Sequence, residues 1–263
     1  MVGLRVMAVA TMACGLAGAQ SGGGPREHIM VATPAYDASV SSFYAKALLQ
    51  TQMVLLQHQI QMTLHVIPNQ IVTRARNTLA HGFLHDGAGY TRMLFIDADV
   101  VWEPEAVLQL LSHDDYYGRK ELVIGSYPVK RYHWDRVREG VGPSDLVNSA
   151  SLFDRRQKGP LVKVTMAATG FMMLTREALE RVEPSVEKYR YPFMGNPNAQ
   201  VANFFDCRVV GNEYLTEDYA FSDLFSKAGG EIFMDTRIRL KHQGHHLYEP
   251  SNEFERESKS DEF

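Results

Sequence analysis

The sequence predicts an α/β fold, a single domain with a doubly wound, mostly parallel central sheet flanked by helices. Two observations predict it. Short apolar runs alternate along the chain with amphipathic helical stripes, and the third run, residues 93–96, is apolar at every position. Alternating strands and helices are typical of such sheets, and a strand covered on both faces is apolar throughout. No linker divides this region, so we expect one domain over residues 25–248.

The elements follow from the spacing of apolar residues. We expect strands at 28–33, 62–67, 93–96 and 122–124, and later at 161–165, 171–174, 231–234 and 237–242. Apolar residues at intervals of three and four predict helices at 40–55, 71–83, 105–111, 176–182 and 217–228. Ser39 and Thr216 are the expected caps of the first and last helix. Residues 127–160 and 184–212 lack periodicity, and long segments of this kind are usually functional or disordered.

Composition excludes several classes of protein. The 263 residues carry 27 Lys and Arg against 31 Asp and Glu, a formal charge of −4, so nothing suggests a protein that binds a nucleic acid duplex. Two cysteines exclude a disulfide scaffold. No apolar run reaches the roughly 20 residues that span a bilayer, so we expect no transmembrane span in the mature chain.

The two ends differ from the body. In residues 1–24, Arg5 precedes a small, apolar stretch that ends at Ala17-Gly18-Ala19, followed by a glycine-rich linker. This layout predicts a cleaved secretory signal and a protein in the lumen of the Golgi or endoplasmic reticulum. The alternative is a flexible N-terminus on a cytoplasmic protein. Residues 249–263 are acidic and are expected to be a disordered tail.

Asp97 and Asp99 follow the third strand. In open α/β sheets ligands bind beyond the carboxyl ends of the strands, and residues two apart in an extended segment point the same way. Two carboxylates there repel each other, and a divalent cation relieves the repulsion. The alternative is an acidic turn before Pro104.

Glu217 and Asp218 form a second acidic pair, behind Thr216. Acids are favoured in a first helical turn, so both residues are explained as helix-capping acids. On a helical wheel, however, Asp218 lies close to the apolar arc that holds Phe221 and Phe225. A carboxylate turned inward there could accept a proton from a substrate hydroxyl as a general base.

His242 ends the last expected strand on its apolar side. A histidine in this position is explained either as a hydrogen-bonded core residue or as a metal ligand, and His245 or His246 could take the metal role instead. The second helix carries Arg74, Arg76 and Asn77. Arg76 lies near the edge of the apolar stripe and could reach a diphosphate or snorkel to solvent. The basic, aromatic segment 130–138 could close over an anionic ligand or be a solvated loop.

Taken together, the motifs resemble family-2-like glycosyltransferases of the GT-A fold over residues 28–248. The resemblance is carried, in order, by Ile71–Asn77, Leu94–Val100, Gly125–Lys130, Ala168–Met172, Thr216–Tyr219 and Leu240–Gly244. It implies a nucleotide-diphospho-sugar transferase, that is, a hexosyltransferase-type enzyme with a nucleotide-sugar donor and a glycan, lipid-linked or protein acceptor.

The resemblance also implies roles for individual residues. Asp97 and Asp99 match the Asp-x-Asp metal motif, and His242 matches the distal metal ligand. Asp218 matches the catalytic base of inverting members, and Glu217 is expected to be a second catalytic residue. An imidazole ligand favours Mn²⁺ over Mg²⁺. The expected donor-binding residues are Thr33, Pro34, Ala35, Tyr36, Arg74, Arg76, Asn77, Asp97, Ala98, Gly170 and Phe171.

We therefore expect a metal-dependent transfer with inversion, and we expect Asp99, Asp218 and His242 to meet around one cation. Two other functions compete with it. A phosphatase of the haloacid-dehalogenase type also places Asp-x-Asp after an apolar strand, although normally after the first. A catalytically silent nucleotide-sugar-binding protein would have the same fold.

Overall fold

The structure is a computed structural model. It describes residues 27–117, with backbone alone at 114–117, and residues 121–134, 149–154, 156–157, 159–193 and 195–250. The predicted secretory leader, residues 135–138 of the basic segment and nearly all of the acidic tail lie outside the described residues.

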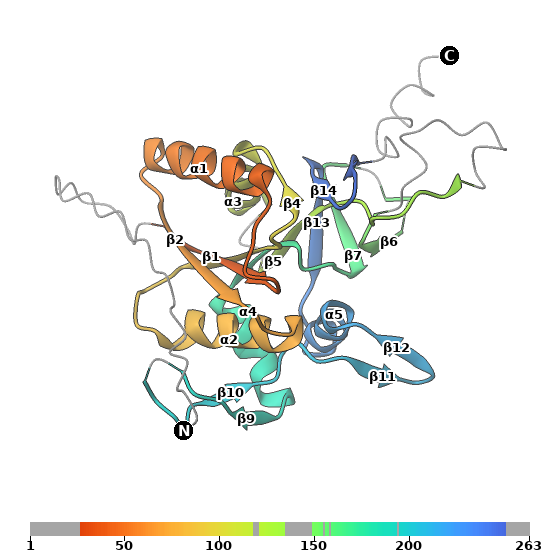
Figure 1. Cartoon of the computed structure of the whole chain (residues 1–263). Coiled ribbons are helices and arrows are strands. Elements are labelled where there is room, and N and C mark those ends of the chain that lie inside the picture. Colours follow the sequence, from red (N-terminus) through yellow and green to blue (C-terminus); the bar gives the residue numbers. More distant parts are fainter. Residues whose placement is uncertain are drawn as a thin grey trace, which may run out of the picture.

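A mixed eight-stranded sheet forms the centre of the domain (Figure 1). β8 pairs antiparallel with both β3 and β5, and β7 pairs antiparallel with both β13 and β6. The other six strands run in one direction, which confirms the predicted mostly parallel α/β sheet. The spatial order is β2 (Gln61–Pro68), β1 (His28–Ala35), β3 (Arg92–Ile96), β8 (Phe171–Thr175), β5 (Leu122–Ser126), β13 (Ile232–Arg239), β7 (Leu161–Met166) and β6 (Leu152–Phe153).

Helices cover both faces of the sheet (Figure 1). α1 (Ser42–Gln57) and α3 (Glu105–Tyr117) lie on one face, and α2 (Val72–His85), α4 (Arg176–Val182) and α5 (Glu217–Lys227) lie on the other. A 3₁₀ turn, η3 (Glu183–Ser185), follows α4.

Each face has its own hydrophobic core, because successive side chains of a strand point to opposite faces. In β1, Met30 packs on the side of α2 while Val31 packs on the side of α1. In β3, Phe95 packs on the side of α2 and Leu94 on the side of α1, and all four side chains are fully buried. The doubly covered sheet therefore explains why both strands are mostly apolar; the buried exceptions are Thr33 in β1 and Arg92 in β3.

The first helix begins later than expected. The Ser41 hydroxyl, not that of Ser39, accepts a hydrogen bond from the Tyr44 N–H at 3.0 Å and caps α1. Ser39 instead donates its hydroxyl to Asp37 at 2.8 Å. The prediction that Ser39 is the cap is wrong because both serines fit the sequence pattern and only the turn geometry separates them.

Residues 184–215 contain two small hairpins that the sequence did not predict. β9 (Lys188–Arg190) pairs with β10 (Gln200–Ala202), and β11 (Arg208–Val210) pairs with β12 (Glu213–Leu215). Three-residue strands are too short to give a periodic pattern.

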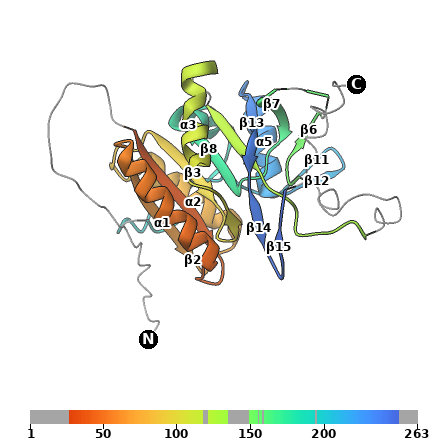
Figure 2. The same ribbon diagram turned by 90° about the horizontal axis from the view of Figure 1, so that it is seen from above.

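The last strands are also arranged differently from the prediction. β13 is one continuous strand across the expected gap at 235–236, and the chain then enters a small sheet of β15 (Leu247–Tyr248), β14 (Lys241–Gln243) and β4 (Val100–Val101) (Figure 2). In this sheet His242 pairs with Val100. The late histidine is therefore fixed beside the residues that follow β3.

Two further observations concern the described part of the chain. No helix in it is long and apolar enough to cross a membrane. Cys207 is a free thiol that is partly exposed.

Candidate functional site: an acidic cleft beyond β1 and β3

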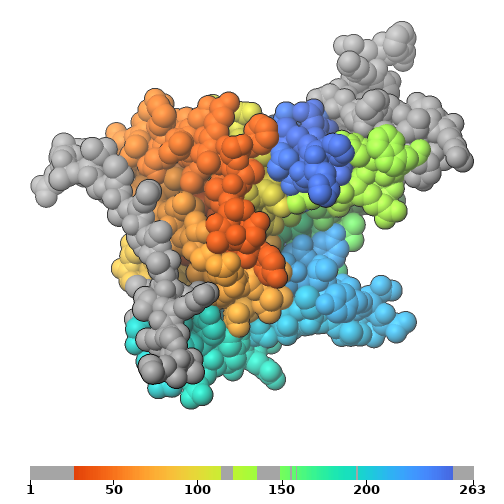
Figure 3. Space-filling model, in the orientation of Figure 1, coloured from red at the N-terminus to blue at the C-terminus, as the bar shows by residue number. Residues whose placement is uncertain are grey.

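A cleft of about 720 Å³ opens beyond the carboxyl ends of β1 and β3. This is the place where open α/β sheets bind ligands. We call it the acidic cleft, because three aspartates contribute to its wall. Its lining residues are Pro34, Tyr36, Asp37, Ser39, Val40, Ser41, Gln70, Ile71, Val72, Asp97, Ala98 and Asp99. On the face in Figure 3, the red segment after β1 lies next to the blue β14–β15 segment.

One wall of the acidic cleft is the N-terminus of α2. Ile71 occupies the cap position without a side-chain hydrogen bond, and Ile71 and Val72 both line the cleft. The first backbone N–H groups of a helix have no partner within the helix, and the helix dipole makes this end favourable for an anion.

Of the predicted metal residues, Asp99 lines the cleft, and His242, which is not among the lining residues, contacts Asp99. The His242 Nε2 lies 3.3 Å from Asp99 Oδ1, and Lys130 Nζ pairs with Asp99 Oδ2. The Gln243 N–H donates to the Asp99 carbonyl at 2.8 Å, which ties the backbones together. Burial alone would raise the pKa of Asp99, but the hydrogen bonds from His242 and Lys130 outweigh it and lower the pKa to about 2. The Asp99 carboxylate is therefore ionised at neutral pH.

The ring of His242 is oriented for binding a cation at Nε2. Its Nδ1 lies 2.8 Å from the Pro128 carbonyl, which can only accept, so Nδ1 carries a proton and donates. In the neutral ring the lone pair of Nε2 then faces Asp99 Oδ1. Two acceptor atoms that point at each other in this way can both bind one cation placed between them. A second hydrogen bond of this kind orients metal-binding histidines in general. His245 and His246, the alternatives from the sequence, are exposed in the turn after β14.

The residues fit a divalent cation with two protein ligands. Within the described residues no group of three His, Cys, Asp or Glu side chains could hold a metal ion, so the expected meeting of Asp99, Asp218 and His242 is not found. Water and donor oxygens would complete the coordination, which is common for Mg²⁺ and related ions.

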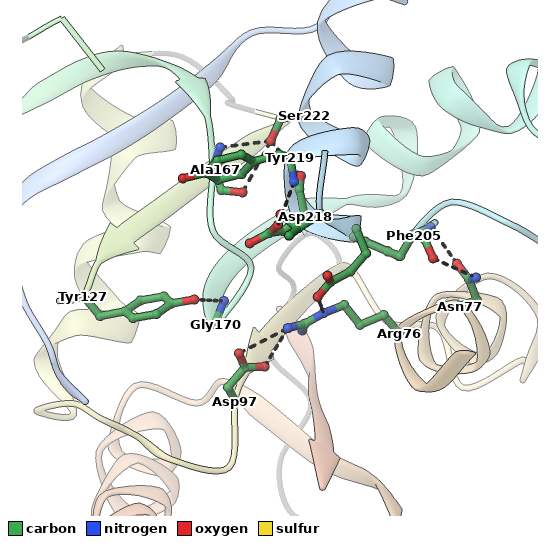
Figure 4. Close-up of polar contacts among 12 residues, drawn as sticks. Arg76, Asn77, Asp97, Tyr127, Ala167, Gly170, Phe205, Asp218, Tyr219 and Ser222 are labelled. Atoms are coloured by element: carbon green, nitrogen blue, oxygen red, sulfur yellow. Dashed lines mark hydrogen bonds and ion pairs between the residues drawn. The ribbon is translucent and has the colours of Figure 1, made fainter. Parts of the chain in front are cut away.

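Asp97 has a different environment from Asp99. Arg76, which is 3% exposed, contacts Asp97 Oδ1 at 2.9 Å and donates to Oδ2 at 3.1 Å (Figure 4). The Nε of the same guanidinium donates to Glu217 at 3.4 Å, and the guanidinium lies over the Phe95 ring. Burial alone would lower the pKa of Arg76, but Asp97 and Glu217 raise it above its usual value. We call this group the Arg76 bridge (Arg76, Asp97 and Glu217).

The Arg76 bridge joins the two acidic pairs that the sequence singled out. It connects the end of β3 to the first turn of α5, and it uses Arg76 and Glu217 for ion pairing within the protein. Arg76 was expected to bind a diphosphate, and Glu217 was expected beside the base. Their side chains instead compensate each other, because the buried guanidinium of Arg76 and the partly buried carboxylates of Asp97 and Glu217 need partners.

Asp218 lies at the edge of this group, partly exposed (Figure 4). Its Oδ1 accepts the Thr216 hydroxyl at 2.5 Å and the Tyr219 N–H at 2.8 Å. Both bonds reach the same oxygen, so among the described residues Oδ2 has no hydrogen-bond donor. Thr216 holds the cap position of α5 but directs its hydroxyl to Asp218 instead of the helix backbone. Asp218 is thus oriented by its own helix start.

Tyr127 is a site residue that we did not single out from the sequence. Its hydroxyl accepts the Gly170 N–H at 3.0 Å (Figure 4), and its ring packs edge-on against His242 with the ring centres 5.0 Å apart. Burial, followed by the charge of Asp97, raises the pKa of Tyr127 well above its usual value, so the phenol stays neutral. A Cβ at Gly170 would lie 2.5 Å from the Tyr127 hydroxyl, so only glycine fits there. The position of Tyr127 directly after an apolar strand was the feature of the sequence that could have indicated its place in the site.

Four predicted donor-binding residues are enclosed in the fold and do not line the cleft. Thr33 bonds Tyr44 at 2.6 Å inside the core, and Ala35 is buried. Phe171 is fully buried beside Trp102. Asn77 exchanges hydrogen bonds with the backbone of Phe205, donating at 3.3 Å and accepting at 2.8 Å. Each side chain is directed inward by its strand or helix face, which the spacing in the sequence did not resolve.

Arg74 lies outside the cleft as well. It donates to Gln70 at 3.2 Å and its guanidinium lies over the Tyr191 ring. Of the predicted donor-binding set, the structure brings four residues to the acidic cleft, namely Pro34, Tyr36, Asp97 and Ala98. Gly170 joins them through its carbonyl, which accepts the Asp97 N–H at 3.1 Å.

Fold and site together define an α/β protein with an acidic, anion-compatible cleft at the carboxyl ends of parallel strands. Neither a protein-family model nor a curated protein matches the sequence. Among solved structures, A197 from STIV aligns at 16% identity and a TM-score of 0.48, over 86% of this chain and 94% of its own.

Two further solved structures align more loosely. A glycosyltransferase involved in the glycosylation of the major capsid of PBCV-1 aligns at 10% identity and a TM-score of 0.30, over 59% of this chain and 63% of its own. The inositol-1-phosphate CTP transferase from T. maritima aligns at 14% identity and a TM-score of 0.38, over 81% of this chain and 86% of its own. All three scores lie below 0.5.

Proposed function

We propose that this protein is a metal-dependent glycosyltransferase that uses a nucleotide-sugar donor. One observation carries the proposal. The acidic cleft is lined by the uncapped N-terminus of α2 and by Asp99, and His242 lies 3.3 Å from Asp99. A cleft of about 720 Å³ that combines an anion-binding helix end with a carboxylate next to an imidazole suits a metal-bound diphosphate with a nucleoside attached.

The residues of the cleft would then have separate roles in binding the donor. Asp99 and His242 would hold the cation, and Mn²⁺ suits a set that includes an imidazole better than Mg²⁺ does. When bound, the cation would neutralise the charge that develops on the leaving nucleoside diphosphate. The N–H groups at the start of α2 would bind the same phosphates, and the exposed ring of Tyr36 would contact the nucleoside.

Asp218 is proposed as the general base. Its Oδ2 would accept the proton of an acceptor hydroxyl while that oxygen forms a bond to the anomeric carbon. The bond between the anomeric carbon and the diphosphate oxygen breaks in the same step, and the nucleoside diphosphate leaves. A single in-line displacement inverts the anomeric configuration.

The Arg76 bridge would position these groups without contacting the substrate. Because it fixes Asp97 to Glu217, it sets the end of β3 against the start of α5. Asp99 and Asp218 follow these two residues closely in sequence, so their separation depends on the bridge. The ion pairing of Asp97 also argues against a phosphatase in which the first aspartate of the pair is a free nucleophile.

A nucleotide-sugar panel, scored by thermal shift with and without Mn²⁺, tests the proposal. A ligand at one hundred times its Kd adds about 2.7 kcal/mol of stability to the native state. We expect one class of donor to raise Tm only with Mn²⁺, and we expect Asp99→Asn to abolish the shift. Asp154→Asn, an exposed acid paired with Arg156, is the matched control and should behave as wild type.

Hydrolysis of the responding donor would then separate an enzyme from a binding protein. Transfer to water or to an acceptor supports the proposal. Donor binding without turnover over a broad acceptor panel would favour a silent nucleotide-sugar-binding protein, for which the lysine already paired with Asp99 is the supporting observation. No shift with any donor would overturn both functions.

A further inference from the structure

Lys130 is a basic residue that directly contacts the proposed cation site. Its ammonium pairs with Asp99 Oδ2, while the other oxygen of that carboxylate lies 3.3 Å from His242 Nε2. One oxygen of Asp99 therefore contacts the Lys130 ammonium and the other contacts the His242 imidazole. The Lys130 and Asp99 side chains are 36% and 40% exposed, so the pair is open to solvent and to ligands.

The surroundings of Lys130 direct it toward this place. A Cβ on Gly244 would lie 3.2 Å from Lys130 Cδ and 3.6 Å from Cγ, so the lysine stem runs across the glycine backbone. Tyr248 lies on the same side, with a ring carbon 3.3 Å from that Cβ position. The residue at 244 thus leaves room for the stem that carries the ammonium to Asp99.

The segment that carries Lys130 also orients His242. The Pro128 carbonyl, two residues before Lys130, accepts the proton of His242 Nδ1 at 2.8 Å, and the Tyr127 ring packs against the imidazole. The short segment 127–130 therefore places the Lys130 ammonium on Asp99 and also orients the ring of His242. A divalent cation on Asp99 and His242 would lie next to the ammonium, and like charges at contact distance repel.

We propose that Lys130 is an internal cation that competes with the divalent cation for Asp99. The proposal rests on the cation site of the proposed function. Without the metal, the ammonium neutralises Asp99. When the metal binds, Lys130 leaves Asp99, and its flexible four-carbon stem allows the freed ammonium to turn to a phosphate of the donor. Lys130 then contributes twice, by lowering the affinity for metal alone and by favouring metal and diphosphate together.

Calorimetric titration of the full chain with Mn²⁺ alone tests the competition. Lys130→Met keeps an apolar stem over Gly244 and removes the charge, and Lys130→Gln is a second variant with a polar end. Lys241→Met is the matched control, because Lys241 pairs with Glu249 in the same small sheet and does not contact Asp99. We expect both Lys130 variants to bind Mn²⁺ about three- to tenfold more tightly than wild type, and the control to stay within about twofold.

A second titration, with Mn²⁺ in the presence of a saturating nucleoside diphosphate, tests the second contribution. There we expect the advantage of the Lys130 variants to vanish or reverse. Equal or weaker Mn²⁺ binding by Lys130→Met and Lys130→Gln, with clear binding by wild type, would overturn the inference and leave the cation site intact. An absence of Mn²⁺ binding in wild type and all variants, with and without nucleoside diphosphate, would overturn the inference and the cation site together.

Discussion

Removal of Arg76 tests whether the Arg76 bridge holds the two acidic pairs together. Arg76 is 3% exposed, and the side chains of its partners Asp97 and Glu217 are 23% and 14% exposed. Removing one partner of a buried ion pair typically costs 3–5 kcal/mol, because a charge is left without compensation. The partial exposure of both carboxylates places the Arg76→Met variant at the low end, about 3 kcal/mol.

Urea unfolding of the full chain at pH 7, followed by circular dichroism, measures this loss. For a domain of this size, about 3 kcal/mol corresponds to a decrease in Tm of roughly 6–12 °C. Arg181→Met is the matched control, because Arg181 pairs with Glu121 at the surface, where such a pair contributes at most about 1 kcal/mol.

A double variant distinguishes charge compensation from lost packing. Arg76→Met combined with Asp97→Asn should cost less than the sum of the two single changes, since the second change removes one uncompensated carboxylate. If Arg76→Met costs no more than Arg181→Met, or if the two single changes add, the bridge does not hold this part of the protein.

The remaining predictions concern the proposed base Asp218, the close contact of Gly170 with Tyr127, and the pH dependence of stability through His81. Asp218→Asn should keep donor affinity and lower transfer at least a hundredfold, measured as donor turnover, because general-base catalysis contributes about 10²–10⁴ in rate; full turnover would place the base elsewhere. Gly170→Ala should lower the free energy of unfolding by about 1–3 kcal/mol, since its Cβ would lie 2.5 Å from the Tyr127 hydroxyl. An unchanged urea midpoint would contradict that close contact. Burial, with the nearby His85, lowers the pKa of His81 to about 4, so protons bind the unfolded state more readily. The contribution of neutral His81 to the free energy of unfolding should be fully present above about pH 6.5. It should decrease as pH falls toward 4, by at most about 2 kcal/mol at pH 5. His81→Gln should flatten that decrease in urea titrations at pH 7 and pH 5, and an equal slope in both proteins would refute the assignment.

Much of the fold could be predicted from local patterns. The strand at 93–96 and the helices at 71–83 and 176–182 lie within a few residues of β3, α2 and α4. Amphipathic spacing is a property of neighbouring residues, so it is visible without knowledge of the fold. Strand direction is not local in this sense. The apolar run of β8 fits a parallel or an antiparallel neighbour equally well, and its antiparallel insertion between β3 and β5 was not predicted.

The candidate site was predicted in part for the same reason. Asp97 and Asp99 were placed at a ligand-binding edge because they follow an apolar strand, and the acidic cleft lies there. Which way each side chain points was not available from spacing. Thr33 and Pro34 are adjacent, yet the first bonds Tyr44 in the core and the second lines the cleft.

The amino-acid sequence by itself determined the class of fold, the position of the acidic pair at a strand end, and the set of polar residues from which a site could be built. Only the tertiary structure decided which of them meet. Arg76 is 141 residues from Glu217, and Lys130 is 31 residues from Asp99. Pairings at such separations depend on the order of strands in the sheet and on the need of each buried charge for a partner, and neither leaves a periodic trace along the chain.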